Sequence, residues 1–143
     1  MEDLVDNFER TMLAVLQLYG AQSRAIDIGA AQTWAETFVP DGRFESPSYP
    51  GPVVGREELA SFAASFAHNT PLARHVITNA HITSMDSTDR ATSTAYLMVV
   101  QTHRNGDVQI LRLTTIEDEL MKTDGGWRVL CRRVILENKG KQK

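Results

Sequence analysis

Two residues of the 143-residue chain could act together in proton transfer, His75 and Asp27. His75 opens a strand-like segment, ARHVITNAHITSM, in which alternation places it on one face with Ile77, Asn79 and His81. Asp27 lies in the apolar stretch AIDIG between two predicted helices. A neutral imidazole accepts a proton near pH 7, and a carboxylate on its other nitrogen fixes the tautomer. The pair predicts a general base, with Asp27 as N-cap of the second helix as the alternative.

The remaining candidates for chemistry have simpler interpretations. His68 is placed at a helix end, His81 on a sheet surface and His103 before a hairpin turn. Their spacing does not match metal ligands, and Cys131 is the single cysteine. We therefore predict no metal, no cofactor and no intrachain disulfide, and interpret Cys131 as a buried structural thiol.

The first half of the chain has the pattern of helices. An apolar stripe at three- and four-residue steps predicts a first helix, and its members are Leu4, Phe8, Met12, Val15, Leu16 and Tyr19. AAQTWAETF (30–38) predicts a second helix ended by a turn at 40–42, and GREELASFAASFAHN (55–69) predicts a third. Between these two helices, RFESPSYPGPVV is extended, as a short hairpin or a rim loop.

From residue 73 onward the pattern changes to four strands, 73–85, 90–104, 107–122 and 126–137. They are rich in β-branched residues, and Asn105-Gly106 and Gly125-Gly126 provide hairpin turns. Helices followed by an antiparallel meander predict an α+β fold with the helices on one face of a curved sheet. Apolar neighbours such as Val99 and Val100 occupy both faces, which predicts a homodimer, with a trimer as the alternative.

Composition narrows the function classes. The net charge of −3 and the pI near 5.8 give no general attraction to nucleic acid or acidic membranes. No stretch approaches 18 apolar residues, so we expect no membrane span and a cytoplasmic location. Residues 1–137 form one predicted domain, and 138–143 are expected to be a short basic, disordered tail.

Several segments together resemble the SnoaL-like branch of the nuclear transport factor 2-like superfamily. They are LYGAQSRAIDIGAAQTWAETFVPDGRFES, GREEL, ARHVITNAHI and DELMKTDGGWRVLCRRV, and the likeness extends over residues 5–136. Its nearest look-alikes are the scytalone dehydratase, bile-acid 7α-dehydratase and hexachlorocyclohexane dehydrochlorinase group. The resemblance implies a cone-shaped α+β barrel with N-terminal helices packed into a strongly curved, mostly antiparallel sheet around an apolar pocket.

The resemblance also implies roles for individual residues. Asp27 and His75, 48 positions apart, match an Asp–His pair of the look-alike enzymes. Gln22 stands where relatives commonly place a pocket Tyr or Trp, which puts any phenol-dependent step in doubt, although Tyr19 could substitute if its hydroxyl points inward. Arg132, five residues after Trp127, matches a position where relatives often place a pocket arginine and is a predicted substrate-binding residue, although parity alone does not choose between Arg132 and Arg133. The remaining predicted substrate-binding residues are Trp34, Phe62, Asn79 and Met98.

These observations predict a cofactor-independent lyase or isomerase of the dehydratase type. It would act on a hydrophobic cyclic molecule such as a polyketide, a steroid-like or an aromatic compound, with His75 as base and Asp27 orienting it. Two alternatives share the fold: a non-catalytic binding protein for an apolar ligand, and a small structural subunit like that of ring-hydroxylating dioxygenases. An enclosed pocket with a His75–Asp27 hydrogen bond would favour the enzyme, and a filled cone would favour the structural subunit.

Overall fold

The computed structural model describes residues 4–136, with side chains from residue 7 onward. The predicted basic tail, 138–143, lies outside the described residues. Along the described chain the elements are α1 (Leu4–Asp27), α2 (Ala31–Ala35), β1 (Phe38–Glu45), β2 (Val53–Val54), α3 (Arg56–Asn69), β3 (Ala73–Ser87), β4 (Arg90–Thr102), β5 (Val108–Thr123) and β6 (Gly126–Leu136). Within this part of the chain, no helix is long and apolar enough to cross a membrane.

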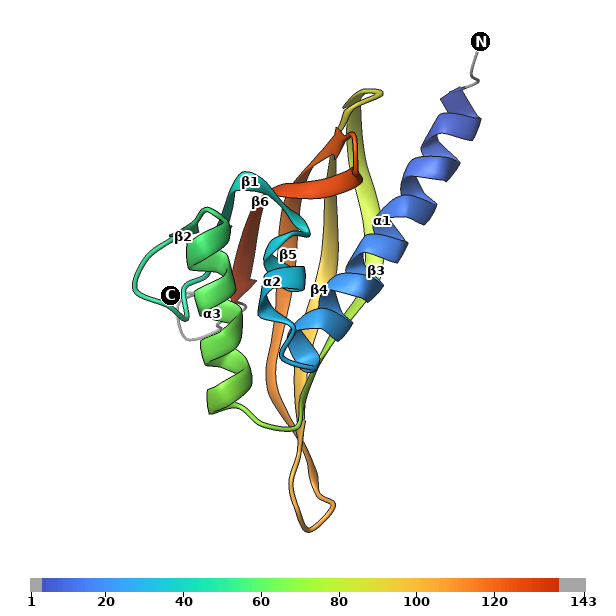
Figure 1. Ribbon diagram of the computed structural model, residues 1–143. Coiled ribbons are helices and arrows are strands. Elements are labelled where there is room, and N and C mark those ends of the chain that lie inside the picture. Colours follow the sequence, from blue (N-terminus) through green and yellow to red (C-terminus); the bar gives the residue numbers. More distant parts are fainter. Residues whose placement is uncertain (1–3, 137–143) are drawn as a thin grey trace, which may run out of the picture.

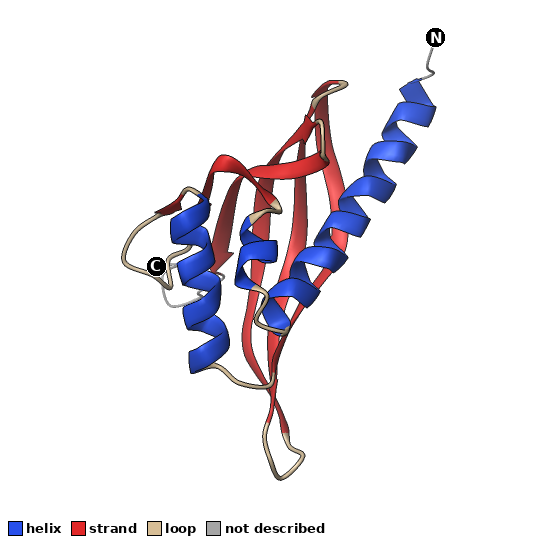
Figure 2. Ribbon diagram, in the orientation of Figure 1, coloured by secondary structure: helices blue, strands red, loops and turns tan. Residues whose placement is uncertain are grey.

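The strands form one curved sheet in the order β2-β1-β6-β5-β4-β3, and the three helices pack against its concave face (Figures 1 and 2). All neighbouring strands are antiparallel except β1 and β6, which run parallel. Gly106 and Gly126 adopt φ of +95° and +114°, which lets the chain reverse tightly. The α+β class, the three helices and the four-strand meander are therefore confirmed.

The end of α1 places Asp27 beside the start of β3. Gly29 has a φ of +81°, and the Ala30 N–H bonds back to the Ala25 carbonyl at 2.8 Å, so the helix ends with a left-handed residue just beyond Asp27. The N-cap position of α2 is Ala30, and no side chain caps it. The alternative in which Asp27 caps the second helix is therefore wrong.

The predicted stripe of α1 is partly wrong. Val15 and Tyr19 are buried, but Phe8 and Leu16 are about half-exposed. The N-terminal end of α1 diverges from the sheet (Figure 1), and Phe8 near this end stays about half-exposed, whereas Thr11 and Val15 further along are buried. The buried face of the helix instead includes polar residues, and its members are Thr11, Val15, Leu18, Tyr19, Gln22, Ser23, Ala25 and Ile26.

Two strand irregularities also correct the sequence analysis. The turn predicted at 40–42 lies inside β1, where the pairing with β6 shifts between Phe38 and Arg43. In β3 the pairing with β4 shifts between Thr78 and His81, and Asn79 has a φ of +56°. Because a bulge reverses strand parity, Asn79 is exposed and Ala80 packs against the core, so Asn79 does not share the inward face with His75.

The convex face of the sheet has no helix over it among the described residues (Figure 2). Register pairs Met98 with Leu113 and Tyr96 with Thr115, and Tyr96, Leu113 and Ile110 are exposed. Val99 faces the buried side while its neighbour Val100 is partly exposed. An apolar strip therefore crosses the outer face of β4 and β5, as the sequence pattern predicted.

Candidate active site

The last residue of α1 and the third residue of β3 meet at one edge of the interior. His75 Nδ1 lies 2.9 Å from Asp27 Oδ1, and the His75 backbone N–H donates to the same oxygen at 2.9 Å. The side chains are 13% and 17% exposed, and the Phe66 ring packs edge-on against the imidazole at 4.8 Å. An ionised carboxylate only accepts hydrogen bonds, so the Nδ1 position carries the proton and the lone pair of a neutral imidazole is on Nε2.

His75 also lines a cavity between the helices and the concave sheet face. Its volume is about 40 Å³, and the empty space between its walls, counted out to solvent, is about 590 Å³. Most of the walls are apolar: Ile26, Trp34, Phe44, Phe62, Phe66, Ile77, Leu97, Val99 and Val134. Asp27 is not part of the lining but borders a surface groove between α1 and β3. His75 therefore lies between the cavity and an outer groove, and the carboxylate of Asp27 is on the groove side.

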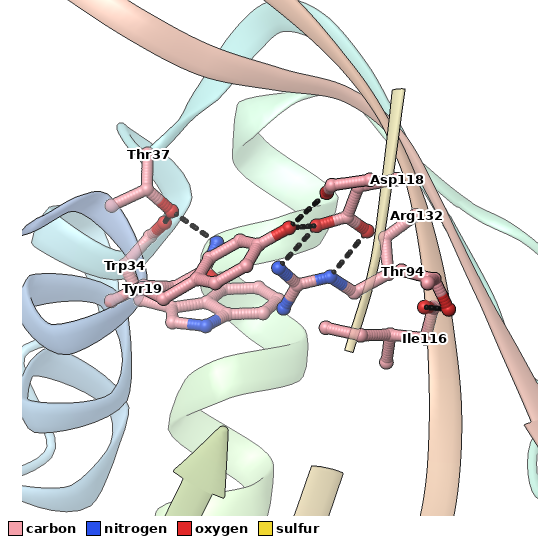
Figure 3. A network of polar contacts seen from close by, with 9 residues as sticks. Tyr19, Trp34, Thr37, Thr94, Ile116, Asp118 and Arg132 are labelled. Carbon is pink, nitrogen blue, oxygen red and sulfur yellow. Dashed lines mark hydrogen bonds and ion pairs between the residues drawn. The ribbon is translucent and has the colours of Figure 1, made fainter. Parts of the chain in front are cut away.

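A buried ion pair lies deeper in the fold. Arg132 donates from Nε and Nη2 to the two carboxylate oxygens of Asp118, at 2.9 and 2.8 Å. The Tyr19 hydroxyl donates to the same carboxylate at 2.7 Å and lies 2.6 Å from the Ser93 hydroxyl. Figure 3 shows the phenol and the guanidinium converging on Asp118. The Arg132 and Asp118 side chains are 3% and 0% exposed, so each depends on the other for charge compensation.

The contacts with Asp118 fix the charge states of Arg132 and Tyr19. Burial by itself lowers the pKa of Arg132, but the adjacent Asp118 charge and its hydrogen bonds outweigh that effect, so the net pKa is raised and the guanidinium stays cationic. Burial, reinforced by the Asp118 charge, raises the pKa of Tyr19 far above its usual value. Tyr19 therefore remains a neutral phenol whose proton is committed to Asp118.

A second chain of hydrogen bonds anchors Gln22. Its Nε2 donates to Thr37 Oγ1 at 2.8 Å, and Thr37 Oγ1 donates to the Trp34 carbonyl at 2.5 Å (Figure 3). Gln22 and its neighbour Ser23 both line the cavity. Gln22 Oε1 and Ser23 Oγ are buried and have no hydrogen-bond partner among the described residues.

The cavity reaches solvent at the loop between β1 and β2. Ser48, Tyr49 and Arg112 line it there, and Ser48 is exposed. Arg112 Nη1 donates to the Tyr49 hydroxyl at 3.0 Å, and the guanidinium lies 5.4 Å from the Tyr49 ring centre. Tyr49 also packs edge-on against Phe62 at 4.9 Å.

The structure gathers part of the predicted site. His75, Gln22, Trp34, Phe62 and Arg132 all line one cavity. The choice between the two arginines is decided, because Arg133 is on the opposite face with its side chain 54% exposed.

Three other predicted positions differ. Met98 is wrong as a lining residue, since its neighbours Leu97 and Val99 point inward. Asn79 is displaced by its bulge, as described above. Tyr19 is buried, but its hydroxyl serves the Asp118 network and the residue is absent from the cavity wall.

Sequence reasoning missed Asp118. The signal was available, because Asp118 alternates with the buried residues Ile116 and Leu120 and must share their inward face. Tyr49 and Arg112 were missed for another reason: a loop residue and a strand residue 63 positions apart meet only in the folded chain.

The other histidines lie away from the cavity. His68, in the last turn of α3, and His81 are exposed, and His103 is exposed with its Nε2 2.9 Å from the Gln109 side-chain oxygen. Within residues 4–136, no group of three His, Cys, Asp or Glu side chains could hold a metal ion.

A curved sheet that wraps helices around an apolar cavity is the cone architecture of the nuclear transport factor 2-like proteins. The family profile of the SnoaL-like domain matches residues 10–133. The chain belongs to this family, the SnoaL-like branch of that superfamily. A search of curated protein sequences finds no match.

Solved structures agree with the fold. A protein of unknown function from Mycobacterium tuberculosis is similar with a TM-score of 0.85 and 26% identity over 95% of this chain and 77% of that one. A nuclear transport factor 2-like protein with a cystatin-like fold from Novosphingobium aromaticivorans has a TM-score of 0.81 and 21% identity, over 99% of this chain and 95% of that one. A Catenulispora acidiphila protein in complex with S-DNPA has a TM-score of 0.74 and 26% identity, over 86% of this chain and 92% of that one. Family membership supports the binding of a small molecule.

Proposed function

We propose that this protein is a cofactor-independent lyase or isomerase of the dehydratase type, acting on a hydrophobic cyclic molecule held in the cavity. The observation that carries the proposal is the geometry of His75. Its Nδ1 is bonded to Asp27, the ring lines the cavity, and Nε2 is the nitrogen left to meet a ligand. An oriented imidazole of this kind is the arrangement that general-base catalysis requires.

In the proposed reaction, His75 Nε2 removes a proton from a carbon next to a carbonyl group, and Asp27 stabilises the imidazolium that forms. In an elimination, the imidazolium returns this proton to the departing hydroxyl group, so that an alkene and water are released. In an isomerisation, it returns the proton to another carbon of the same molecule. Both routes balance without a cofactor, and a positioned base contributes about 10²–10⁴-fold.

Arg132 is a charged side chain that lines the same cavity as His75. Because Asp118 already accepts from two of its nitrogens, Arg132 offers a partly neutralised cation to an enolate oxygen rather than a full free charge. Trp34, Phe62 and the other apolar walls would position the ring of the substrate. Tyr19 has no acid role in this scheme, since its phenol proton is held by Asp118.

The proposal is tested in D₂O with a panel of cyclic β-hydroxyketones and β,γ-unsaturated ketones, followed by ¹H NMR. Deuterium entry at the carbon next to the carbonyl reports proton removal even where no product accumulates. We expect His75→Ala to lower the rate about 10²–10⁴-fold. His81→Ala, an exposed histidine on the same strand, is the matched control and should be unchanged. Wild-type exchange in His75→Ala would refute the assignment.

Asp27→Asn separates orientation from mere packing. The amide can donate to Nδ1, which would move the ring proton to Nε2 and remove the lone pair from the cavity side. We expect a slower enzyme with a changed tautomer, visible in long-range ¹H–¹⁵N spectra of the imidazole. An unchanged tautomer and rate would show that Asp27 does not orient the base.

A non-catalytic binding protein remains the second candidate, and Gln22 favours it. This residue stands where the look-alike enzymes place an aromatic side chain, and the nearby phenol of Tyr19 is committed to Asp118. The Catenulispora relative in complex with S-DNPA supports ligand binding in either case. Ligand binding without isotope exchange across the panel would favour the binder. The structural-subunit alternative predicted a filled cone with no cavity, whereas the structure has a cavity of about 40 Å³.

A further inference from the structure

Gln22 lines the proposed ligand cavity with a buried amide whose oxygen has no hydrogen-bond partner among the described residues. It is 1% exposed, so its amide is shielded from solvent outside the cavity. Its nitrogen is anchored on Thr37, while its oxygen has no partner among the described residues. Leaving a buried acceptor unsatisfied costs about 1–3 kcal/mol, a cost that a hydrogen-bond donor on a ligand would remove.

The orientation of this amide is dictated by its neighbours. The single proton of the Thr37 hydroxyl is used on the Trp34 carbonyl, so Thr37 Oγ1 can only accept from Gln22. A rotated amide would set its oxygen 2.8 Å from another oxygen with no proton between them. The chain Gln22–Thr37–Trp34 therefore directs Nε2 to Thr37 and leaves Oε1, an acceptor, as the atom of Gln22 without a partner among the described residues.

We propose that Gln22 is a specificity-determining residue, and that the cavity selects cyclic ligands carrying a hydroxyl group over ligands of equal shape that lack a donor. The inference rests on the proposed ligand cavity but not on the catalytic role of His75. Ser23 lines the same cavity with a second unpartnered oxygen. Its hydroxyl can rotate and act as donor or acceptor, so of these two neighbouring side chains only Gln22 requires a donor.

The test compares two small rings of nearly equal shape, p-cresol and p-xylene. Their dissociation constants are measured by NMR titration, following the methyl groups of Ile26, Ile77 and Leu97, which line the cavity. We expect the wild-type protein to bind p-cresol about tenfold more tightly, which corresponds to one net hydrogen bond. Gln22→Met keeps the side-chain volume and removes the acceptor, so the preference should disappear while p-xylene still binds.

Two further variants separate Gln22 from its surroundings. Ser23→Ala, the matched control, should retain the tenfold preference. Thr37→Val removes the group that fixes the amide, so the preference should shrink to about threefold or less, and this variant serves if Gln22→Met does not fold. A full, roughly tenfold preference that survives in Gln22→Met or in Thr37→Val, or its loss in Ser23→Ala, would overturn the role of Gln22.

Failure of the inference can be told apart from failure of the proposed function. Equal binding of both rings by the wild-type protein would overturn the selection of donors and leave the ligand cavity in place. If neither ring shifts any cavity methyl group, both the donor selection and the ligand cavity are refuted. The His75 assignment is decided separately by isotope exchange.

Discussion

Removing the charge of Asp118 should strongly destabilise the fold while leaving its shape intact. Asp118→Asn is isosteric, but it takes away the only carboxylate that contacts the buried Arg132 among the described residues. The asparagine amide can keep some of the hydrogen bonds from Arg132, but it cannot balance the positive charge of the guanidinium. It also gives the Tyr19 hydroxyl a weaker acceptor.

The expected size follows from burial. Both side chains of the pair are at most 3% exposed, so solvent cannot replace the lost partner. Breaking a buried pair from one side costs about 3–5 kcal/mol, a large part of the roughly 5–15 kcal/mol that holds a typical domain together. With a urea dependence of about 2 kcal/mol per molar, the midpoint should fall by about 1.5–2.5 M.

Urea unfolding followed by tryptophan fluorescence measures the change, in a cycle of Asp118→Asn, Arg132→Met and the double variant. Each single change leaves a buried charge without its partner, whereas the double change leaves none. The double variant should therefore be more stable than the sum of the singles predicts, by about 2 kcal/mol or more. A loss below about 1 kcal/mol in Asp118→Asn, with no coupling, would show that the pair is hydrated and would refute this reasoning.

Three further predictions concern other parts of the fold. Burial raises the pKa of Tyr19 above its unfolded value of 10.0, so its contribution to stability is complete below pH 10 and is lost as the pH rises beyond it. Tyr19→Phe should therefore reduce the alkaline loss of unfolding free energy by about 1.4 kcal/mol per pH unit, and an unchanged slope would contradict this. A Cβ on Gly42 would stand 2.7 Å from Phe38 Cβ, so Gly42→Ala should lower the melting temperature. Gly20→Ala, in open space on α1, is the control and should raise the melting temperature or leave it unchanged. A melting temperature lower in Gly20→Ala than in Gly42→Ala would show that the β1 bulge moves to make room for the methyl group. The apolar strip on the convex face predicts a homodimer, so Leu113→Glu should halve the mass measured by light scattering, and a monomeric wild type would refute the dimer while a trimeric mass would support the alternative.

The sequence by itself determined the three helices and the four-strand meander, and it singled out Asp27 and His75, whose side chains the structure places 2.9 Å apart. Periodicity separated helices from strands because buried faces repeat at 3.6 and 2 residues, and local signals such as Gly106 and Gly126 marked the hairpins. Asp27 was conspicuous because a carboxylate in an apolar break needs a partner. Each of these features depends on neighbours within a few positions of the chain.

Only the tertiary structure decided which residues share the cavity. Parity predicted that Asn79 faces inward, but a bulge, set by pairing with a neighbouring strand, turned it to solvent. The same parity rule would have found Asp118, yet its partner Arg132 is 14 positions away and its partner Tyr19 is 99 positions away. The acceptor presented by Gln22 depends on Thr37 and Trp34 from the next elements. Register and long-range hydrogen bonds are properties of the assembled sheet, and no local pattern of residues records them.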